Sequence, residues 1–305
     1  SGLSFLKFVS RKALVHPSLL SGLTRVGSAA RILLGEWLPQ DSGLRLRLQG
    51  FGKHPFKLPA KGYIDKLKAK SGNDNEQQAS RQEQNISFFT GCLANYRQTE
   101  IAEATQVLVA ETTGRKAVVP LAQTCCGMAA MAAGRPEETL DLAKRNIKAF
   151  EDNELPIVTS CSSCYFQLKT YDDLFADDTE WQERAKRFTE RLREFSSFFL
   201  DKFSKNTEMI SGSNKTSDLK VFDPDPCRMQ FKLNISKGPR QLLKLFQGID
   251  LQELEGGPQC CGQGGLFQVA HPDLALQVQE RLLEEYGALS ANTVVTACSG
   301  CLLQW

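Results

Sequence analysis

The stretches QTCCGM (123–128) and QCCGQGG (259–265) each place two consecutive cysteines directly before a glycine. All ten cysteines of the chain fall into the frame that these two stretches define. The ten cysteines form two sets of five. The first three cysteines of the second set lie 135 positions after those of the first set, and the last two lie 137 positions after. Each repeat reads C-x32-C-C-G and closes with C-x2-C, and repetition of a frame indicates a duplicated unit. The two sets are Cys92, Cys125, Cys126, Cys161 and Cys164, then Cys227, Cys260, Cys261, Cys298 and Cys301.

Short apolar runs alternate with helical patterns from residue 86 onward. This alternation predicts an α/β fold with mostly parallel sheets. The expected strands are 86–89, 117–119, 155–159, 219–222, 251–254 and 293–295. The expected helices are 100–113, 136–153, 181–203, 239–246 and 272–288.

The cysteines follow the expected strands, where helices begin. Ligands of parallel α/β sheets bind at the carboxyl ends of strands, so we expect five thiols to converge there in each repeat. Helix N-termini favour thiolates. Gly127 and Gly262, after the cysteine pairs, allow a tight turn and a close backbone approach.

Three alternatives compete for the ten thiols. A disulfide within Cys125–Cys126 or Cys260–Cys261 is disfavoured, because adjacent Cα atoms lie about 3.8 Å apart and a normal bridge needs roughly 4.4–6.8 Å. Buried structural cysteine explains one or two thiols but not a duplicated set. Zinc is the serious competitor, since C-x2-C is a common zinc element. Five thiols per repeat, without the chain's three histidines (His16, His54 and His271), favour an iron–sulfur cluster over zinc.

Composition excludes several classes of protein. Of the 305 residues, 41% are hydrophobic, which is enough for a core and excludes a globally disordered chain. The net charge of +2 gives no indication of a nucleic-acid-binding protein. No secretory signal is evident, and the long charge-free run 117–134 is a poor membrane span. We therefore expect a cytoplasmic protein in a reducing compartment. The sequence singles out no catalytic residue.

The chain divides into five expected parts. Residues 1–70 form a basic helical N-terminal segment with helices at 4–20 and 23–38, and 71–85 form a linker. The first cysteine unit occupies 86–204, a second polar linker 205–218, and the second unit 219–305. Residues 1–62 hold ten Lys or Arg against Glu36 and Asp41. Two interpretations stay open for this segment. It either makes peripheral contact with the inner face of a membrane or with a partner, or it is an ordinary pair of solvated helices.

These residues resemble the cysteine-rich CCG domain family. The matching stretches are FFTGC (88–92), QTCCGM, SCSSC (160–164), DPDPC (223–227), QCCGQGG and ACSGCLLQ (297–304). Members include one of the subunits of heterodisulfide reductase and the iron–sulfur subunits of glycolate, lactate and anaerobic glycerol-3-phosphate dehydrogenases. The resemblance implies two pseudo-symmetric α/β lobes. It also implies a non-cubane [4Fe–4S] cluster on each set of five cysteines, with zinc as an alternative in one lobe.

At two positions the sequence differs from what is common in the dehydrogenase branch of the family. Arg228 stands where the dehydrogenase branch often has His, and Cys298 is present where that branch often lacks it. The retention of five cysteines in both repeats resembles the heterodisulfide reductase branch. The phrase CLLQ and the basic N-terminal segment resemble the dehydrogenase branch. No ferredoxin motif C-x2-C-x2-C-x3-C-P occurs.

The resemblance implies an iron–sulfur electron-transfer subunit of an oxidoreductase complex. Its expected partner is a flavin-containing or ferredoxin-type subunit, and its expected acceptor is a quinone or a thiol/disulfide couple. Two alternatives stay open: clusters that themselves reduce a disulfide substrate, and a zinc-stabilised scaffold subunit.

Overall fold

The computed structural model describes residues 61–71, 86–204 and 219–305, apart from 236, 256, 258 and 266. The helices predicted at 4–20 and 23–38 lie outside the described residues, as does nearly all of both predicted linkers. These parts stay predictions. We call residues 86–204 lobe 1 and residues 219–305 lobe 2.

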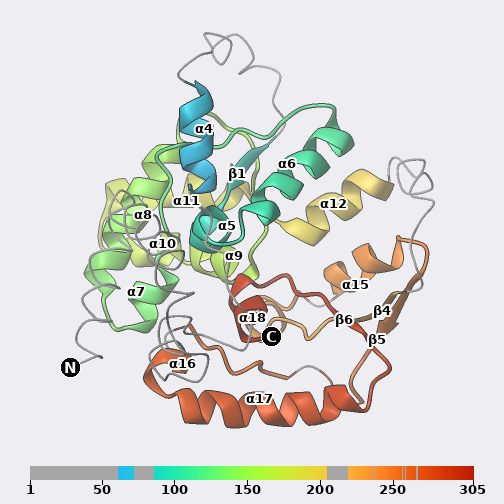
Figure 1. Ribbon diagram of the computed structural model, residues 1–305. Helices are drawn as coiled ribbons and strands as arrows, with labels where there is room; N and C mark the ends of the chain where they lie inside the picture. The colour runs from blue at the N-terminus through green and yellow to red at the C-terminus, as the bar shows by residue number, and fades with distance from the viewer. Residues whose placement is uncertain are drawn as a thin grey trace, which may run out of the picture.

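Strands and helices alternate in both lobes, which confirms the predicted α/β fold with two lobes (Figure 1). Lobe 1 contains β1 (Ser87–Phe89), α5 (Gly91–Tyr96), α6 (Thr99–Thr113), α7 (Met128–Ala132), α8 (Pro136–Phe150), β2 (Ile157–Thr159), α9 (Ser162–Lys169), α10 (Tyr171–Leu174), α11 (Thr179–Arg191), β3 (Leu192–Glu194) and α12 (Phe195–Ser204). Lobe 2 contains β4 (Leu219–Phe222), α14 (Cys227–Phe231), α15 (Lys237–Lys244), β5 (Ile249–Gln252), α16 (Phe267–Ala270), α17 (Pro272–Gly287), β6 (Thr293–Val294) and α18 (Ser299–Gln304).

The two sheets are parallel and share one topology. In lobe 1 the strand order is β1–β2–β3, and Val118 pairs with Ser87 on the free side of β1. In lobe 2 the order is β5–β4–β6. Thus β4 corresponds to β1, β6 to β2, and β5 to the segment around Val118. The strand predicted at 117–119 is reduced in the structure to this single bridge.

Helices cover both faces of the lobe 1 sheet. Phe89 and Ile157 pack on one face with side chains of α8, α9 and α11, whereas Phe88 and Val158 pack on the other with α6 and α12. All four side chains are fully buried. A sheet buried on both faces needs continuous apolar strands, and the sequence ISFF (86–89) meets this requirement.

The prediction of one long helix over 181–203 was wrong. Helix α11 ends at Arg191, Leu192 adopts an extended backbone, and β3 pairs in parallel with β2 before α12 begins. The Glu194 carboxylate accepts hydrogen bonds from the amides of Ser196 (3.0 Å) and Ser197 (2.8 Å). These bonds satisfy amide groups that open a helix and have no partner within it. The apolar spacing continues through the break, so periodicity alone could not reveal it.

Helix α4 (Tyr63–Ser71) packs against lobe 1. Tyr63 and Ile64 are buried with residues of α6 and α12, and the amide of Ile64 donates to Asn95 Oδ1 at 2.8 Å. The end of the basic segment is therefore anchored to the first lobe.

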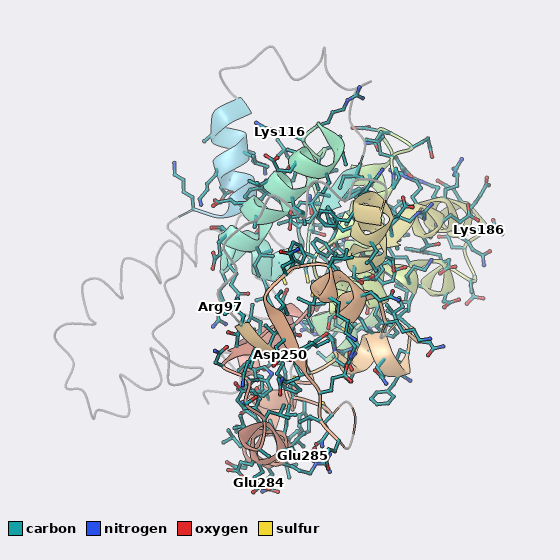
Figure 2. All side chains as sticks on the ribbon, turned by 90° about the vertical axis from the view of Figure 1, so that its right-hand side faces the viewer. Arg97, Lys116, Lys186, Asp250, Glu284 and Glu285 are labelled. Carbon is teal, nitrogen blue, oxygen red and sulfur yellow. The ribbon has the colours of Figure 1, made fainter. Side chains whose placement is uncertain are left out.

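Charged side chains project outward from both lobes. Lys116 and Lys186 of lobe 1 and Glu284 of lobe 2 extend away from the ribbon (Figure 2). Among the helices that the structure describes, none combines the length and apolar composition required to cross a bilayer.

Replacing Glu194 should weaken the start of α12. Losing a capping acceptor costs roughly 0.5–2 kcal/mol, so Glu194→Ala should lower the free energy of unfolding by about that amount in denaturant titration. Glu194→Gln retains one acceptor oxygen and should recover part of the loss. Equal stability of the Ala variant and the parent would contradict the capping role.

Candidate metal centre

Every cysteine lies at the carboxyl side of a parallel strand or at the start of a helix. In lobe 1, Cys92 lies in the first turn of α5, the pair Cys125–Cys126 precedes α7, Cys161 is the N-cap of α9 and Cys164 lies in its first turn. In lobe 2, Cys227 begins α14, the pair Cys260–Cys261 lies before α16, Cys298 is the N-cap of α18 and Cys301 lies within it. All ten are free thiols in the structure.

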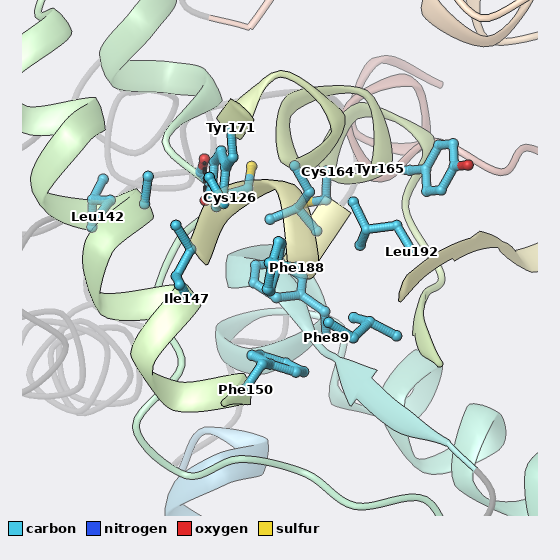
Figure 3. Close-up of a cluster of buried hydrophobic side chains, with 14 of the residues drawn as sticks. Phe89, Cys126, Leu142, Ile147, Phe150, Cys164, Tyr165, Tyr171, Phe188 and Leu192 are labelled. Atoms are coloured by element: carbon cyan, nitrogen blue, oxygen red, sulfur yellow. Dashed lines mark hydrogen bonds between the residues drawn. The ribbon is translucent and has the colours of Figure 1, made fainter. Parts of the chain in front are cut away.

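The five sulfurs of lobe 1 lie together at the end of its apolar core. The Sγ atoms of Cys125 and Cys92 are 3.9 Å apart. Four of the five side chains are buried, and Cys92 is half-buried. Figure 3 places Cys126 and Cys164 beside Tyr171 at one end of the buried side chains. Burial of this kind shields a bound group from water.

Contacts between the thiols move their pKa values in opposite directions. The hydrogen bond with Cys125, and then burial, raise the pKa of Cys92. Hydrogen bonds from Cys126 and Cys92 lower the pKa of Cys125. Contacts with Cys126 and Cys161, followed by burial, raise the pKa of Cys164. The contacts thus favour the thiolate, the form that binds metals, at Cys125 over its neighbours.

The five sulfurs of lobe 2 also come together. The Sγ atoms of Cys261 and Cys301 are 3.2 Å apart, and the amide of Gly262 donates to Cys260 Sγ at 3.4 Å. The hydrogen bond with Cys227 lowers the pKa of Cys260, and the same contact raises the pKa of Cys227. Cys260 is exposed within the described structure, so lobe 2 has the more open set.

Within the part of the chain that the structure describes, no preformed site for a single ion accompanies these contacts. Within the described ranges, no three His, Cys, Asp or Glu side chains are arranged to hold one metal ion. The case for a centre therefore rests on the convergence of five sulfurs in each lobe and on their chemistry.

Two buried polar residues hold the cysteine pair of lobe 1. The side-chain amide of Asn146 donates to the carbonyl of Cys125 (2.9 Å), and its Oδ1 accepts from the amide of Thr124 (2.7 Å). The Tyr171 hydroxyl donates to the carbonyl of Cys126 at 3.0 Å. Both side chains are fully buried, so these bonds satisfy backbone groups that water cannot reach.

Sequence reasoning missed Asn146 and Tyr171. The available signal was Asn146 itself, a polar residue within the apolar positions of the helix over 136–150. With the 135-residue offset between the two cysteine pairs, Arg281 of lobe 2 corresponds to Asn146 of lobe 1. There Arg281 Nε donates to Gln259 Oε1 at 3.2 Å, and Gln259 also bonds Glu285. Buried side chains thus hold the backbone of this turn in lobe 1, whereas in lobe 2 more exposed charged side chains hold the side chain of Gln259, which precedes the cysteine pair.

A pocket of about 300 Å³ opens at the carboxyl ends of β4 and β5, lined in part by Phe222, Asp223, Asp225 and Arg240. Arg240 forms an ion pair with both carboxylate oxygens of Asp225. Asp223 is 95% buried, and its Oδ2 has no partner in the described structure. Burial, and then the negative charge of Asp225, raise the pKa of Asp223 to about 6.

The glycine after each cysteine pair adopts a left-handed backbone, with φ of +88° at Gly127 and +84° at Gly262. A Cβ at Gly262 would also collide with the backbone carbonyl oxygen of Ala275. Gly134 has a similar φ of +69° but open space around it. Both features support the predicted close turn.

Gly262→Ala should therefore cost more stability than Gly134→Ala. The left-handed conformation alone costs roughly 1–2 kcal/mol, and overpacking adds roughly 1–3 kcal/mol. We expect a loss of about 1–2 kcal/mol for Gly134→Ala and about 2–5 kcal/mol for Gly262→Ala in denaturant unfolding. Equal losses would show that the collision is relieved without cost.

Asp223→Asn should stabilise the protein in a pH-dependent manner. The pKa of Asp223 rises from the ordinary 3.8 to about 6 on folding, so the folded state binds this proton more tightly than the unfolded state. The resulting penalty is absent below pH 4, grows between pH 4 and 6, and reaches roughly 3 kcal/mol above pH 6. The Asn variant should melt at a higher temperature than the parent at pH 7.5 and at the same temperature near pH 4. A difference that does not vary with pH would contradict this explanation.

Comparison with known proteins gives the context for these two sets of thiols. The CCG cysteine-rich domain model matches residues 86–169 and 224–305. Over 220 residues the chain is 31% identical to the probable glycolate oxidase iron-sulfur subunit of Bacillus subtilis (strain 168), a match that covers 72% of this chain and 48% of that protein. It therefore spans about half the length of that relative.

Two shorter relatives are matched over most of their length. Lactate utilization protein A of Bacillus subtilis (strain 168) is 30% identical over 72% of this chain and 89% of its own length. Lactate utilization protein A 2 of Bacillus cereus (strain Q1) is 32% identical over 72% of this chain and 88% of its own length. The two regions matched by the family model include all ten cysteines. As the resemblance predicted, the chain belongs to the family of proteins built on the cysteine-rich CCG domain.

Proposed function

We propose that the chain is an iron–sulfur electron-transfer subunit of an oxidoreductase complex. The observation that carries the proposal is the convergence of five thiols in each lobe at the carboxyl side of a parallel sheet. Donor sets made only of thiolates suit iron–sulfur clusters. Relatives named as an iron–sulfur subunit of glycolate oxidase and as lactate utilization proteins support the same conclusion.

The residues present fit two clusters. One would be held by Cys92, Cys125, Cys126, Cys161 and Cys164, and the other by Cys227, Cys260, Cys261, Cys298 and Cys301. We propose the non-cubane [4Fe–4S] type for both sets, because each retains five thiols. When bound, such clusters supply one-electron oxidation and reduction.

The protein's own contribution is to position the thiols and to control their surroundings. Asn146 and Tyr171 hold the carbonyls of the lobe 1 cysteine pair. Burial of four thiols keeps water from that set. The positive charge of Arg228 lowers the pKa of Cys260, after the larger effects of hydrogen bonds from Cys227 and Cys261. These features favour the thiolate form that a metal requires.

We propose that a flavin-containing or ferredoxin-type partner donates electrons and that a quinone or a thiol/disulfide couple accepts them. Either acceptor takes up two electrons and two protons, giving a quinol from a quinone or two thiols from a disulfide. The exposed Cys260 supports exchange with a partner on the side of lobe 2. Contact of residues 1–62 with a membrane surface and a cytoplasmic location remain part of this proposal.

Anaerobically purified protein should contain about eight iron and eight sulfide per chain, four for each cluster. Cys125→Ser and Cys260→Ser each remove one ligand, in lobe 1 and lobe 2 respectively. Each variant should lose up to half of the iron, and each should alter a different component of the electron paramagnetic resonance (EPR) spectrum of the reduced protein. Metal and sulfide analysis together with the spectra provides the measurement.

Ser160→Ala is the matched control, since Ser160 precedes Cys161 and its hydroxyl has no partner in the described structure. This variant should keep its full iron content. Protein that carries zinc and no iron would overturn the proposal and favour a scaffold role. Reoxidation of the reduced clusters by a disulfide alone, with release of its two thiols, would instead assign the disulfide chemistry to the clusters themselves.

A further inference from the structure

The two lobes meet at the turns that carry their C-x2-C motifs. Helix α9 of lobe 1 begins after Cys161, and α18 of lobe 2 begins after Cys298. The amide of Ser162 donates to the carbonyl of Ala297 at 2.8 Å, across the boundary between the lobes. Figure 1 shows α18 next to α9. The two candidate centres are therefore neighbours.

One side chain of lobe 1 reaches a sulfur of lobe 2. The Ser163 Oγ lies 3.1 Å from Cys298 Sγ. A thiolate has no proton to donate, so Ser163 must be the donor once Cys298 binds a metal. Arg228, which follows Cys227 in lobe 2, donates from Nη1 to the same Ser163 oxygen at 3.4 Å. Ser163 therefore lies between two lobe 2 residues in a chain of hydrogen bonds that ends on a sulfur, and such chains strengthen their members.

We propose that Ser163 is a positioning residue of lobe 1 that sets the reduction potential of the lobe 2 centre. The inference rests on the proposed iron–sulfur function. Hydrogen bonds to a cluster's sulfur ligands favour the reduced, more negative state and so raise the potential. A lobe 1 hydroxyl therefore makes the redox behaviour of lobe 2 depend on correct docking of the two lobes.

The test is a redox titration followed by EPR on anaerobically prepared, iron-loaded protein. Cys92→Ser and Cys227→Ser first assign the two signals to lobe 1 and lobe 2. Ser163→Ala should then shift the lobe 2 midpoint potential to a more negative value and leave the lobe 1 midpoint unchanged. Selective loss of lobe 2 iron in this variant would support the same role, because Ser163 belongs to lobe 1.

Two variants separate this role from a local structural one. Ser163→Thr retains the hydroxyl and should restore the lobe 2 midpoint. Ser162→Ala removes a buried hydroxyl that has no partner in the described structure, one residue earlier on the same helix, and should shift neither signal. A Ser163→Ala protein with full iron whose lobe 2 midpoint equals that of the parent, or whose lobe 1 midpoint alone moves, would overturn the inference.

Arg228 offers an independent check through a double-mutant cycle. Arg228→Gln should also shift the lobe 2 midpoint to a more negative value. Because the guanidinium acts partly through Ser163, the double variant should shift by less than the sum of the single variants. Full additivity would show that Arg228 does not act through Ser163.

Absence of iron from the parent protein would overturn the proposed function. An iron-loaded parent whose lobe 2 midpoint does not move in Ser163→Ala would overturn only the inference about Ser163.

Discussion

The structure depends on one constraint: in each lobe five sulfur atoms, distant in sequence, must meet at the carboxyl side of a parallel sheet. A parallel sheet meets this requirement because all its strands end on the same edge and the following helices start there. The short strands of lobe 1 are consistent with this role. Strands β1 and β2 each span three residues, enough to bring Cys92 and Cys161 to one edge and to anchor both faces of the sheet in apolar cores.

Bringing thiols together also buries backbone groups around them, and the polar residues beside the cysteine pair differ between the lobes. In lobe 1, Asn146 and Tyr171 donate to the backbone carbonyls of the pair inside the core, whereas in lobe 2 Gln259, Arg281 and Glu285 bond one another through their side chains nearer the surface. The polar groups of lobe 1 are therefore shielded from water, and those of lobe 2 are more accessible. The duplicated frame fixes where the cysteines lie along the chain, but the surroundings of the two sets differ.

The lobes do not act as separate modules in this structure. Their C-x2-C turns are joined by the Ser162–Ala297 backbone bond and by the contact of Ser163 with Cys298. Helices α12 and α15 also pack across the boundary. A change that disturbs the docking of the lobes would therefore alter the surroundings of both sets of thiols, even if each lobe kept its own fold.

The sequence by itself determined the α/β class, the duplicated cysteine frame and most helices and strands, since these depend on local periodicity and on residue spacing. It did not reveal β3, because the apolar spacing runs unbroken from α11 into α12, and the break is stabilised by pairing with β2 and by the Glu194 cap. Nor could it identify Asn146, Tyr171 or Ser163 as supports of the thiols. Their partners lie 21, 45 and 135 positions away, and only tertiary packing brings such groups within hydrogen-bonding distance.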